Sequence, residues 1–182
     1  MSHVAVLLAD GFEEIEAVTV IDVLRRADIQ VRTLALKDKL VKGAHGIDIH
    51  ADGLLEVEQG MDWDLVVLPG GQPGANTLRD DPRVESLLER QLGHNKMVAA
   101  ICAAPIALGA HGMLKGRNVT CYPGFEDQLI DAHLSRETVV IDQKLTTSRG
   151  PGTALAFALA LVTQLKGQTL ADKLRQEMQA NS

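Results

Sequence analysis

The stretch Met97-Val98-Ala99-Ala100-Ile101-Cys102-Ala103-Ala104-Pro105 joins two kinds of local structure. Residues 97–101 form a short apolar run, as is typical of a buried parallel strand. Pro105 suits the first turn of a helix, where its missing N–H costs nothing, and a helix is expected over Ala103–Ala110. Cys102 then stands at a sharp strand-to-helix turn, with its sulfur facing the positive end of a helix dipole. Nucleophiles are often presented in this way.

Outward from this stretch, strand and helix patterns alternate along the chain. Strands are expected at 4–8, 29–36, 65–68, 97–101, 118–121 and 138–142, with a hairpin at 40–51 and a return strand at 144–147. Further helices are expected at 13–27, 82–92, 153–165 and 170–178. This alternation predicts an α/β fold, a three-layer sandwich in which helices cover both faces of a mostly parallel sheet.

Three of the predicted strands end in loops that contain small or reactive residues. These loops are Ala9–Glu14, Leu68–Gly71 and Ile101–Ala103. In open sheets of this type, ligands bind beyond the carboxyl ends of the strands. If the three strands are neighbours, the loops converge on one site.

The composition limits the kind of protein this is. With 182 residues, 46% of them hydrophobic, the chain fits one domain over residues 1–182 with a full-sized core. Its two cysteines, Cys102 and Cys121, argue against a disulfide framework and match no zinc spacing. The net charge of −6 and the lack of a basic block argue against stable nucleic-acid binding. Without a signal-peptide pattern or an apolar run of roughly 18 residues, we expect a cytoplasmic protein outside the membrane.

The glycines and histidines favour chemistry without a cofactor. The glycines of segment 70–74 form no dinucleotide or P-loop motif, and no histidine, cysteine and carboxylate cluster has metal-ligand spacing. No histidine directly follows Cys102 and none lies beyond His133, so a Cys-His-Glu amidase triad has little support. His45 and His50, in the predicted hairpin, are candidates for lining a site or an interface.

Cys102 needs help to act as a nucleophile, because the thiolate is the reactive form. Gly70 and Gly71 let backbone N–H groups approach without side-chain hindrance, and with the amide of Ala103 they could form a hole for an oxyanion. The alternative is that Cys102 is a small buried hydrophobe, as free cysteines usually are. Both interpretations are open at this point.

The first helix opens with Glu13, Glu14 and Glu16. Acidic residues in a first turn are commonly present for the helix dipole alone. Glu16 shares a helix face with Thr19, Val20 and Val23, which should be covered, and a covered carboxylate tends to hold its proton. Such a carboxyl suits a general acid beside a thiolate. The helix is apolar on more than one face, however, so periodicity does not separate Glu14 from Glu16.

Together, these segments resemble the ThiJ/PfpI superfamily, in particular the branch that contains the Parkinson-disease-associated protein deglycase. The resemblance covers nearly the whole chain. Its motifs occur in the expected order at residues 9–16, 22–27, 66–71, 99–105 and 145–153.

The resemblance implies a flavodoxin-like sandwich and a homodimer whose site is close to the subunit interface. It assigns to Glu16 the protonated carboxyl that hydrogen-bonds the reactive Cys102. It also implies that the amides of Gly71 and Ala103 face the sulfur. Arg26 matches a family arginine near the site and the interface.

The chain departs from the family pattern at two positions. Tyr122 stands where many relatives carry a histidine near the cysteine, which puts in doubt any mechanism that needs an imidazole there. His45 stands where a hairpin arginine is expected. In addition, superfamily proteases place a histidine directly after the nucleophile, and Ala103 stands there instead. A protease function is therefore weakly supported.

The resemblance implies a small cysteine enzyme that acts on reactive dicarbonyls such as methylglyoxal, or on early glycation adducts of proteins or nucleotides. Cys102 would add to the aldehyde and Glu16 would shuttle protons, without glutathione, metal or other cofactor. The alternative is a redox-sensing stress protein in which Cys102 is oxidised to sulfinate and switches a chaperone-like activity. Thiamine-pathway or amidotransferase-like chemistry has only the fold in its favour. The sequence leaves the physiological substrate and the role of Cys121 open.

Overall fold

A central sheet of seven strands organises the chain. The computed structural model describes residues 2–180. The strand order is β10-β11-β7-β6-β1-β2-β5, and all neighbours pair in parallel except the antiparallel pair β10–β11. The strand bounds are β1 His3–Leu8, β2 Gln30–Ala35, β5 Gly53–Leu54, β6 Leu65–Leu68, β7 Met97–Ile101, β10 Val139–Asp142 and β11 Leu145–Ser148.

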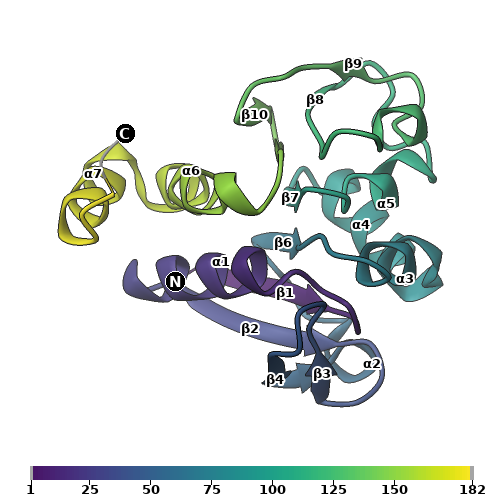
Figure 1. Ribbon diagram of the computed structural model, residues 1–182, viewed down its shortest axis with the longest axis horizontal. Coiled ribbons are helices and arrows are strands. Elements are labelled where there is room, and N and C mark those ends of the chain that lie inside the picture. The colour runs from purple at the N-terminus through teal and green to yellow at the C-terminus, as the bar shows by residue number, and fades with distance from the viewer. Residues whose placement is uncertain (1, 181–182) are drawn as a thin grey trace.

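Two groups of helices enclose this sheet. One group packs α1 (Glu14–Arg26) against α6 (Ala154–Lys166), which in turn contacts α7 (Gln168–Glu177). The other contains α3 (Gly74–Asp80), α4 (Pro82–Gly93) and α5 (Ile106–Gly109). Figure 1 shows the groups on the two sides of β6 and β7. The predicted α/β sandwich, with helices on both faces of a mostly parallel sheet, is confirmed.

The central strands are buried because they are apolar on both faces. Every residue of β6 and β7 is buried, and so is every residue of β1 after His3. A strand covered on both sides by helices needs such a continuous apolar run, in contrast to an alternating pattern. Each fully buried leucine or valine contributes roughly 1.5–3 kcal/mol. Their burial places the three strands that carry the candidate site in the interior of the sheet.

The strand order brings the three predicted loops together. β1 lies beside β6, and β6 lies beside β7, in the register Val4–Leu65 and Leu65–Met97. All three strands run in the same direction, so their carboxyl ends lie at one edge of the sheet. The predicted convergence of the loops at 9–14, 68–71 and 101–103 is confirmed.

Two small strand pairs lie outside the central sheet. The predicted hairpin is present as β3 (Leu40–Lys42) and β4 (Asp48–His50), and it docks on the first loop through the Gly11 N–H to Lys42 carbonyl bond of 2.7 Å. β8 (Asn118–Val119) pairs only with β9 (His133–Leu134). The expected strand at 118–121 is therefore shorter than predicted and does not join the central sheet.

Several short elements differ from the sequence expectations. α2 (Leu55–Glu58), α3, β5 and the 3-10 turns at Glu126–Gln128 and Pro151–Thr153 were not predicted, because their patterns are too short or too polar to show a period. The helix expected over Ala103–Ala110 was wrong in extent, since only α5 is helical. Tight bonds such as Ile106 N–H to the Ala103 carbonyl, 3.2 Å, precede it. Within residues 2–180, no helix has the length and apolar character required to span a bilayer.

Candidate active site

The main chain of Cys102 is held in an unusual conformation. Its φ of 64° lies in the left-handed region, which costs a non-glycine residue on the order of 1–3 kcal/mol. Its N–H donates to the Ser148 carbonyl at 2.9 Å, and its carbonyl accepts the Tyr122 N–H at 2.8 Å. The parallel partner β11 and the segment after β8 therefore fix the turn from both sides. Conformations of this kind occur preferentially at functional sites.

Glu16 is the carboxyl that faces this cysteine. It lies in the first turn of α1 and is completely buried. Its Oε2 accepts the Gly70 N–H at 2.7 Å, while Oε1 makes no hydrogen bond within residues 2–180. Burial raises the pKa of Glu16 to about 7, although the Gly70 amide and the neighbouring Cys102 thiol oppose the shift. A proton on this carboxyl is therefore carried by Oε1, the oxygen without a partner.

Because Gly70 has no side chain, it leaves room for the Cys102 side chain and the Glu16 carboxyl to lie side by side. A Cβ at this position would lie 2.6 Å from Cys102 Cβ, 2.8 Å from Glu16 Oε2 and 3.1 Å from the Ala103 nitrogen. Real Cβ atoms do not approach other atoms so closely, so any side chain at residue 70 would displace the cysteine or the carboxyl. Gly71 is constrained differently, because its φ of 89° is favoured only by glycine.

The ionisation of Cys102 depends on Glu16. Burial raises the pKa of the Cys102 thiol well above its ordinary value, and a charged Glu16 raises it further. The N–H groups of Ala103 and Gly71 point at the sulfur and act in the opposite direction. When Glu16 holds its proton, the sulfur faces a hydrogen-bond donor instead of an anion. A protonated Glu16 therefore favours the Cys102 thiolate more than an ionised Glu16 does.

The expectation that a helix dipole activates Cys102 was wrong. α5 begins four residues after the cysteine and comprises one turn, Ile106–Gly109, so it contributes few aligned peptide dipoles. Two backbone amides, from Ala103 and Gly71, take the place of the helix terminus. Their positive ends are the local stabilisation available to a charged sulfur.

Glu14 points away from the cysteine, towards the β3–β4 hairpin. Its Oε1 accepts the His45 N–H at 2.6 Å and the Ile47 N–H at 3.3 Å, and its Oε2 lies 3.0 Å from His45 Nδ1. Burial alone would raise the pKa of Glu14, but its own backbone N–H and these hairpin donors outweigh burial and lower the pKa to about 2. The geometry separates the two carboxyls that periodicity left equivalent.

His45 lies at the hairpin and contacts the glutamates instead of Cys102. Its side chain is 70% exposed, and Nδ1 is 3.5 Å from Glu13 Oε2. The hydrogen bond to Glu14 and the charge of Glu13 raise the pKa of His45. Ligand atoms of Glu13, Glu14 and His45 lie within 4.8 Å of one another, a grouping that sequence spacing did not reveal. Hydrogen bonds to the hairpin already account for the Glu14 oxygens, and we assign no metal to this cluster.

Tyr122 and Arg26 lie at different distances from the turn. The Tyr122 backbone holds Cys102, while its half-exposed ring packs edge-on to Phe125 with 6.5 Å between centroids. Arg26 ends α1, ten residues and about 15 Å beyond Glu16, where it forms an ion pair with Asp22 at 2.7 Å. Arg26 does not reach the cysteine of its own chain. Its predicted place near a site requires a second subunit and stays a prediction.

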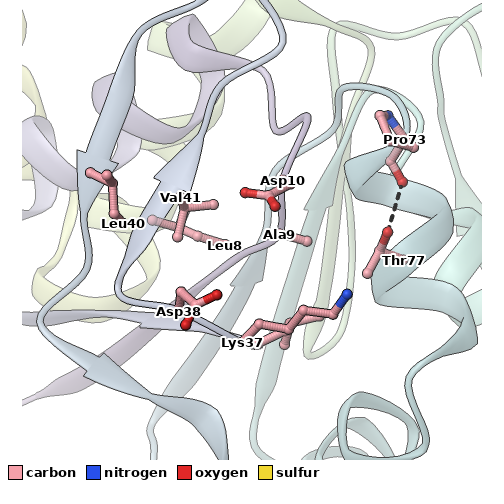
Figure 2. Close-up of a pocket in the computed structure, with 10 residues that line it drawn as sticks. Leu8, Ala9, Asp10, Lys37, Asp38, Leu40, Val41, Pro73 and Thr77 are labelled. Carbon is pink, nitrogen blue, oxygen red and sulfur yellow. Dashed lines mark hydrogen bonds between the residues drawn. The ribbon is translucent and has the colours of Figure 1, made fainter.

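A small cavity adjoins the first of the converging loops. It measures about 100 Å³ and is lined from β1, the β2–β3 connection and α3. Figure 2 shows Lys37 extending across it towards Thr77. Asp10 borders the cavity, but its Oδ1 already accepts the Lys42 N–H at 2.9 Å. Cys102 does not line this cavity, so the cavity lies next to the candidate site and does not belong to it.

The fold and the turn together define a flavodoxin-like α/β protein that presents a cysteine at the carboxyl edge of its sheet. The strand ends, the strained turn and the buried carboxyl all lie at this one edge. The DJ-1/PfpI family pattern matches residues 2–164, and the chain belongs to that family. The resemblance noted in the sequence is thereby confirmed.

Individual relatives support this membership. Protein dj-1beta of Drosophila melanogaster is 41% identical over 166 residues, covering 90% of this chain and 89% of the relative. Glutathione-independent glyoxalase DJR-1.2 of Caenorhabditis elegans is 35% identical over 175 residues, covering 95% and 93%. The chain spans only 38% and 45% of the lengths of the Arabidopsis thaliana DJ-1 homologs B and A, at 41% and 39% identity over 91% and 94% of this chain.

Solved structures agree closely with the fold. Oxidized Toxoplasma gondii DJ-1 superimposes with a TM-score of 0.94 at 34% identity, covering 98% of both chains. Drosophila melanogaster DJ-1beta gives a TM-score of 0.94 at 38% identity, again covering 98% of both chains. The similarity therefore includes the sheet, both helical layers and the hairpin.

Proposed function

We propose that this protein is a cysteine-dependent, cofactor-independent enzyme that acts on reactive dicarbonyls or on early glycation adducts of proteins and nucleotides. The observation that carries the proposal is the pairing of Cys102, on its strained turn, with the buried and partly unpartnered carboxyl of Glu16. Membership of a family that includes a protein named as a glutathione-independent glyoxalase supports the same substrate chemistry.

The first step is the addition of Cys102 to the aldehyde carbon of methylglyoxal. The C–S bond forms, and the carbonyl electron pair moves to the oxygen, which the amides of Gly71 and Ala103 beside the sulfur would hold. The proton that Cys102 and Glu16 share passes to this oxygen and gives a hemithioacetal. The role of Glu16 is to carry that proton from Oε1.

The second step is an internal oxidation and reduction. Glu16 takes the proton from the former aldehyde carbon and returns it to the neighbouring ketone carbon, while the proton of the hemithioacetal hydroxyl passes to the ketone oxygen. The first carbon becomes a thioester and the second an alcohol, so no external oxidant or reductant is needed. Water then cleaves the thioester, which releases lactate and restores Cys102. From a glycation adduct, the C–S bond forms as the carbon–nitrogen bond breaks, Glu16 gives its proton to the leaving amine, and the same hemithioacetal remains on Cys102.

The decisive test is lactate formation from methylglyoxal by freshly reduced protein without glutathione. We expect turnover in the wild type, none above background in Cys102→Ser, and near wild-type turnover in the matched control Cys121→Ser. Turnover that persists in Cys102→Ser would contradict the mechanism. A wild type without turnover would contradict the enzyme proposal itself.

A second function, redox sensing, is favoured by one specific observation. The structural relative from Toxoplasma gondii is described as oxidized. The groups proposed to hold an oxyanion, Glu16 and the amides of Gly71 and Ala103, suit a sulfinate on Cys102 equally well. Peroxide titration followed by intact mass tests this function. We expect uptake of two oxygens that is lost in Cys102→Ser, whereas oxidation spread over several residues would contradict it.

We also propose a homodimer formed through α1 and the hairpin. Ile15, Val18 and Ile47 are large apolar side chains that are 57%, 46% and 60% exposed. A hollow of about 250 Å³, lined partly by Val18 and Ile49, connects the outer face of α1 with β4. This surface places a partner beside the glutamates. Sedimentation of the wild type and of Val18→Asp tests the proposal, and equal masses for both proteins would contradict it.

A further inference from the structure

A second hollow lies beside the Cys102 turn and has no role in the proposed mechanism. Its volume is about 180 Å³, many times the roughly 15 Å³ that one water needs. It is lined by Cys121, Glu126, Leu134, Ser135, Arg136 and Arg149. The hollow therefore has room for a charged group attached to several carbon atoms.

Two of its lining residues are direct chain neighbours of the groups that hold Cys102. Cys121 precedes Tyr122, whose N–H donates to the Cys102 carbonyl at 2.8 Å. Arg149 follows Ser148, whose carbonyl accepts the Cys102 N–H at 2.9 Å. The hollow thus adjoins the reactive turn through backbone contacts on both sides of it.

The two arginines of this hollow are free to bind. Within residues 2–180, neither the Arg136 nor the Arg149 guanidinium donates a hydrogen bond or joins an ion pair. Seven of the ten arginines do so, namely Arg25, Arg26, Arg32, Arg79, Arg83, Arg90 and Arg117. Arg149 is half-buried and Arg136 is exposed, so both guanidinium groups are accessible to a ligand. The absence of partners at Arg149, which is half-buried, indicates a place for an anion.

The remaining polar groups of the hollow leave a surplus of donors. Glu126 is its one carboxylate, and its Oε2 is held by the Gly124 N–H at 2.6 Å. Its own backbone amide and that of Gly124, followed by the charge of Arg149, lower the pKa of Glu126. Ser135 Oγ accepts the Glu137 N–H at 3.1 Å, so its hydroxyl proton is available. Two guanidinium groups and one carboxylate give a net positive charge.

We propose that this hollow is a subsite for an oxyanion, a carboxylate or phosphate group, on the substrate whose carbonyl reacts at Cys102. The inference rests on the proposed function and narrows its substrate class to acidic aldehydes and to adducts that carry a carboxylate or phosphate. Arg149 supplies the planar fork that matches such a group, and Arg136 closes it from the exposed side. Leu134 and Cys121 form the apolar wall for the connecting carbons.

The test measures binding at Cys102 without requiring turnover. Iodoacetamide alkylates Cys102, and peptide mass gives the rate in the presence of two aldehydes of equal chain length, succinic semialdehyde and butanal. They differ in a terminal carboxylate against a methyl group. We expect succinic semialdehyde to protect Cys102 at about tenfold lower concentration, the ratio produced by roughly 1.4 kcal/mol of charge-assisted hydrogen bonding.

The variants locate this preference. We expect Arg149→Gln to reduce the preference to about twofold, Arg149→Lys to restore part of it, and Arg136→Gln to have a smaller effect. Arg175→Gln, on α7, removes the same charge elsewhere and serves as the control. Equal protection by the two aldehydes in the wild type, or a preference that survives in Arg149→Gln, would overturn the subsite.

A second arm distinguishes the source of the anion. The ³¹P line width of inorganic phosphate is measured with the wild type and with Arg149→Gln. Broadening only with the wild type supports a subsite that a phosphate group occupies by itself. A carboxylate preference without such broadening assigns the subsite to carboxylate-bearing substrates. Absence of lactate turnover with the aldehyde preference intact would remove the proposed enzyme activity but leave the subsite.

Discussion

Glu14 and Glu16 stand two residues apart in the first turn of α1, and both are buried, yet they differ in every other respect. Glu14 faces the hairpin, where its own backbone N–H and three donors from His45 and Ile47 outweigh burial and lower its pKa to about 2. Glu16 faces the sheet edge, where burial outweighs one amide and one thiol and raises its pKa to about 7. Burial thus does not decide whether a carboxyl keeps its proton. The number of donors that reach it decides.

Each carboxyl is covered by a glycine that has no room for a side chain. A Cβ on Gly70 would strike Cys102 Cβ and Glu16 Oε2, and a Cβ on Gly43 would strike Glu14, 2.5 Å from Cδ. A substitution at Gly70 therefore disturbs the surroundings of Glu16, and a substitution at Gly43 separately disturbs those of Glu14.

The largest expected difference is between Gly70→Ala, beside Glu16, and Gly43→Ala, beside Glu14. We expect lactate formation to fall by about 10²–10³, because the new methyl group displaces the sulfur from its amides and from Glu16. Gly43→Ala should change the rate by less than about threefold while loosening the hairpin. Gly60→Ala, where an added Cβ meets no atom within 4 Å, is the control for a methyl group that displaces no neighbour. Equal rates in Gly70→Ala and Gly60→Ala would show that the shared space at residue 70 is not needed.

Glu16→Gln tests whether the reaction needs the proton of the Glu16 carboxyl, because a glutamine amide does not transfer a proton in its place. We expect a loss of about 10² in rate with little change in fold, since proton transfer by a positioned side chain contributes about 10²–10⁴. Glu14→Gln should retain the rate within a few-fold. Circular dichroism and methylglyoxal kinetics on both variants make the comparison. An unchanged rate in Glu16→Gln would remove this residue from the mechanism.

The pH dependence of stability should have opposite signs at the two carboxyls. Because the folded-state pKa of Glu16 is raised from 4.5 to about 7, its stabilisation is complete below pH 4.5 and is lost as pH rises through 7. The loss amounts to about 3 kcal/mol. Glu14, with its pKa lowered from 4.5 to about 2, stabilises above pH 4.5 and loses this contribution as pH falls towards 2.

Urea unfolding of both variants across pH 2–8 measures these contributions. Glu16→Gln should flatten the dependence between pH 4.5 and 7, and Glu14→Gln should flatten it between pH 4.5 and 2. Identical curves for the wild type and Glu16→Gln would contradict the assignment of a raised pKa to this carboxyl.

The smallest effect is expected at His45. Its pKa is raised by the hydrogen bond to Glu14 and by the charge of Glu13, so its stabilisation is present below pH 6.5 and is lost as pH rises through the folded-state pKa. Proton NMR titration of His45 should give a pKa above 6.5 that returns towards this value in Glu14→Gln. Because the side chain is 70% exposed, the change in stability should be slight. A pKa at or below 6.5 would show that the hairpin contact does not persist in solution.

The central strands and their common edge could be predicted from the sequence because they depend on local patterns. β6 and β7 are uninterrupted apolar runs, so each is recognisable as a strand from its own residues. The choice of Cys102 followed from its position directly after β7. These features need only neighbouring residues to be recognised.

The remaining features depend on contacts between distant segments. Nothing local in the helix shows that Glu14 meets His45, 31 residues further on, while Glu16 meets Gly70, 54 residues away. The length of α5 was misjudged because alanine-rich sequence favours helix, whereas the chain turns tightly from Ala103 onward. The hollow around Arg149 unites residues from three segments, 121–126, 134–136 and 149, and shows no motif.

The bond between the Cys102 N–H and the Ser148 carbonyl has a consequence for synthesis on the ribosome. Ser148 follows Cys102 by 46 residues, so at roughly 5–20 residues per second the nascent thiol precedes its partner by about 2–9 s. β11 must be made before the turn can close over the sulfur. During this interval the cysteine belongs to an unfinished chain, with neither the burial nor the amides of the folded site. Every molecule therefore passes through a brief period in which the Cys102 thiol has the chemistry of an ordinary thiol.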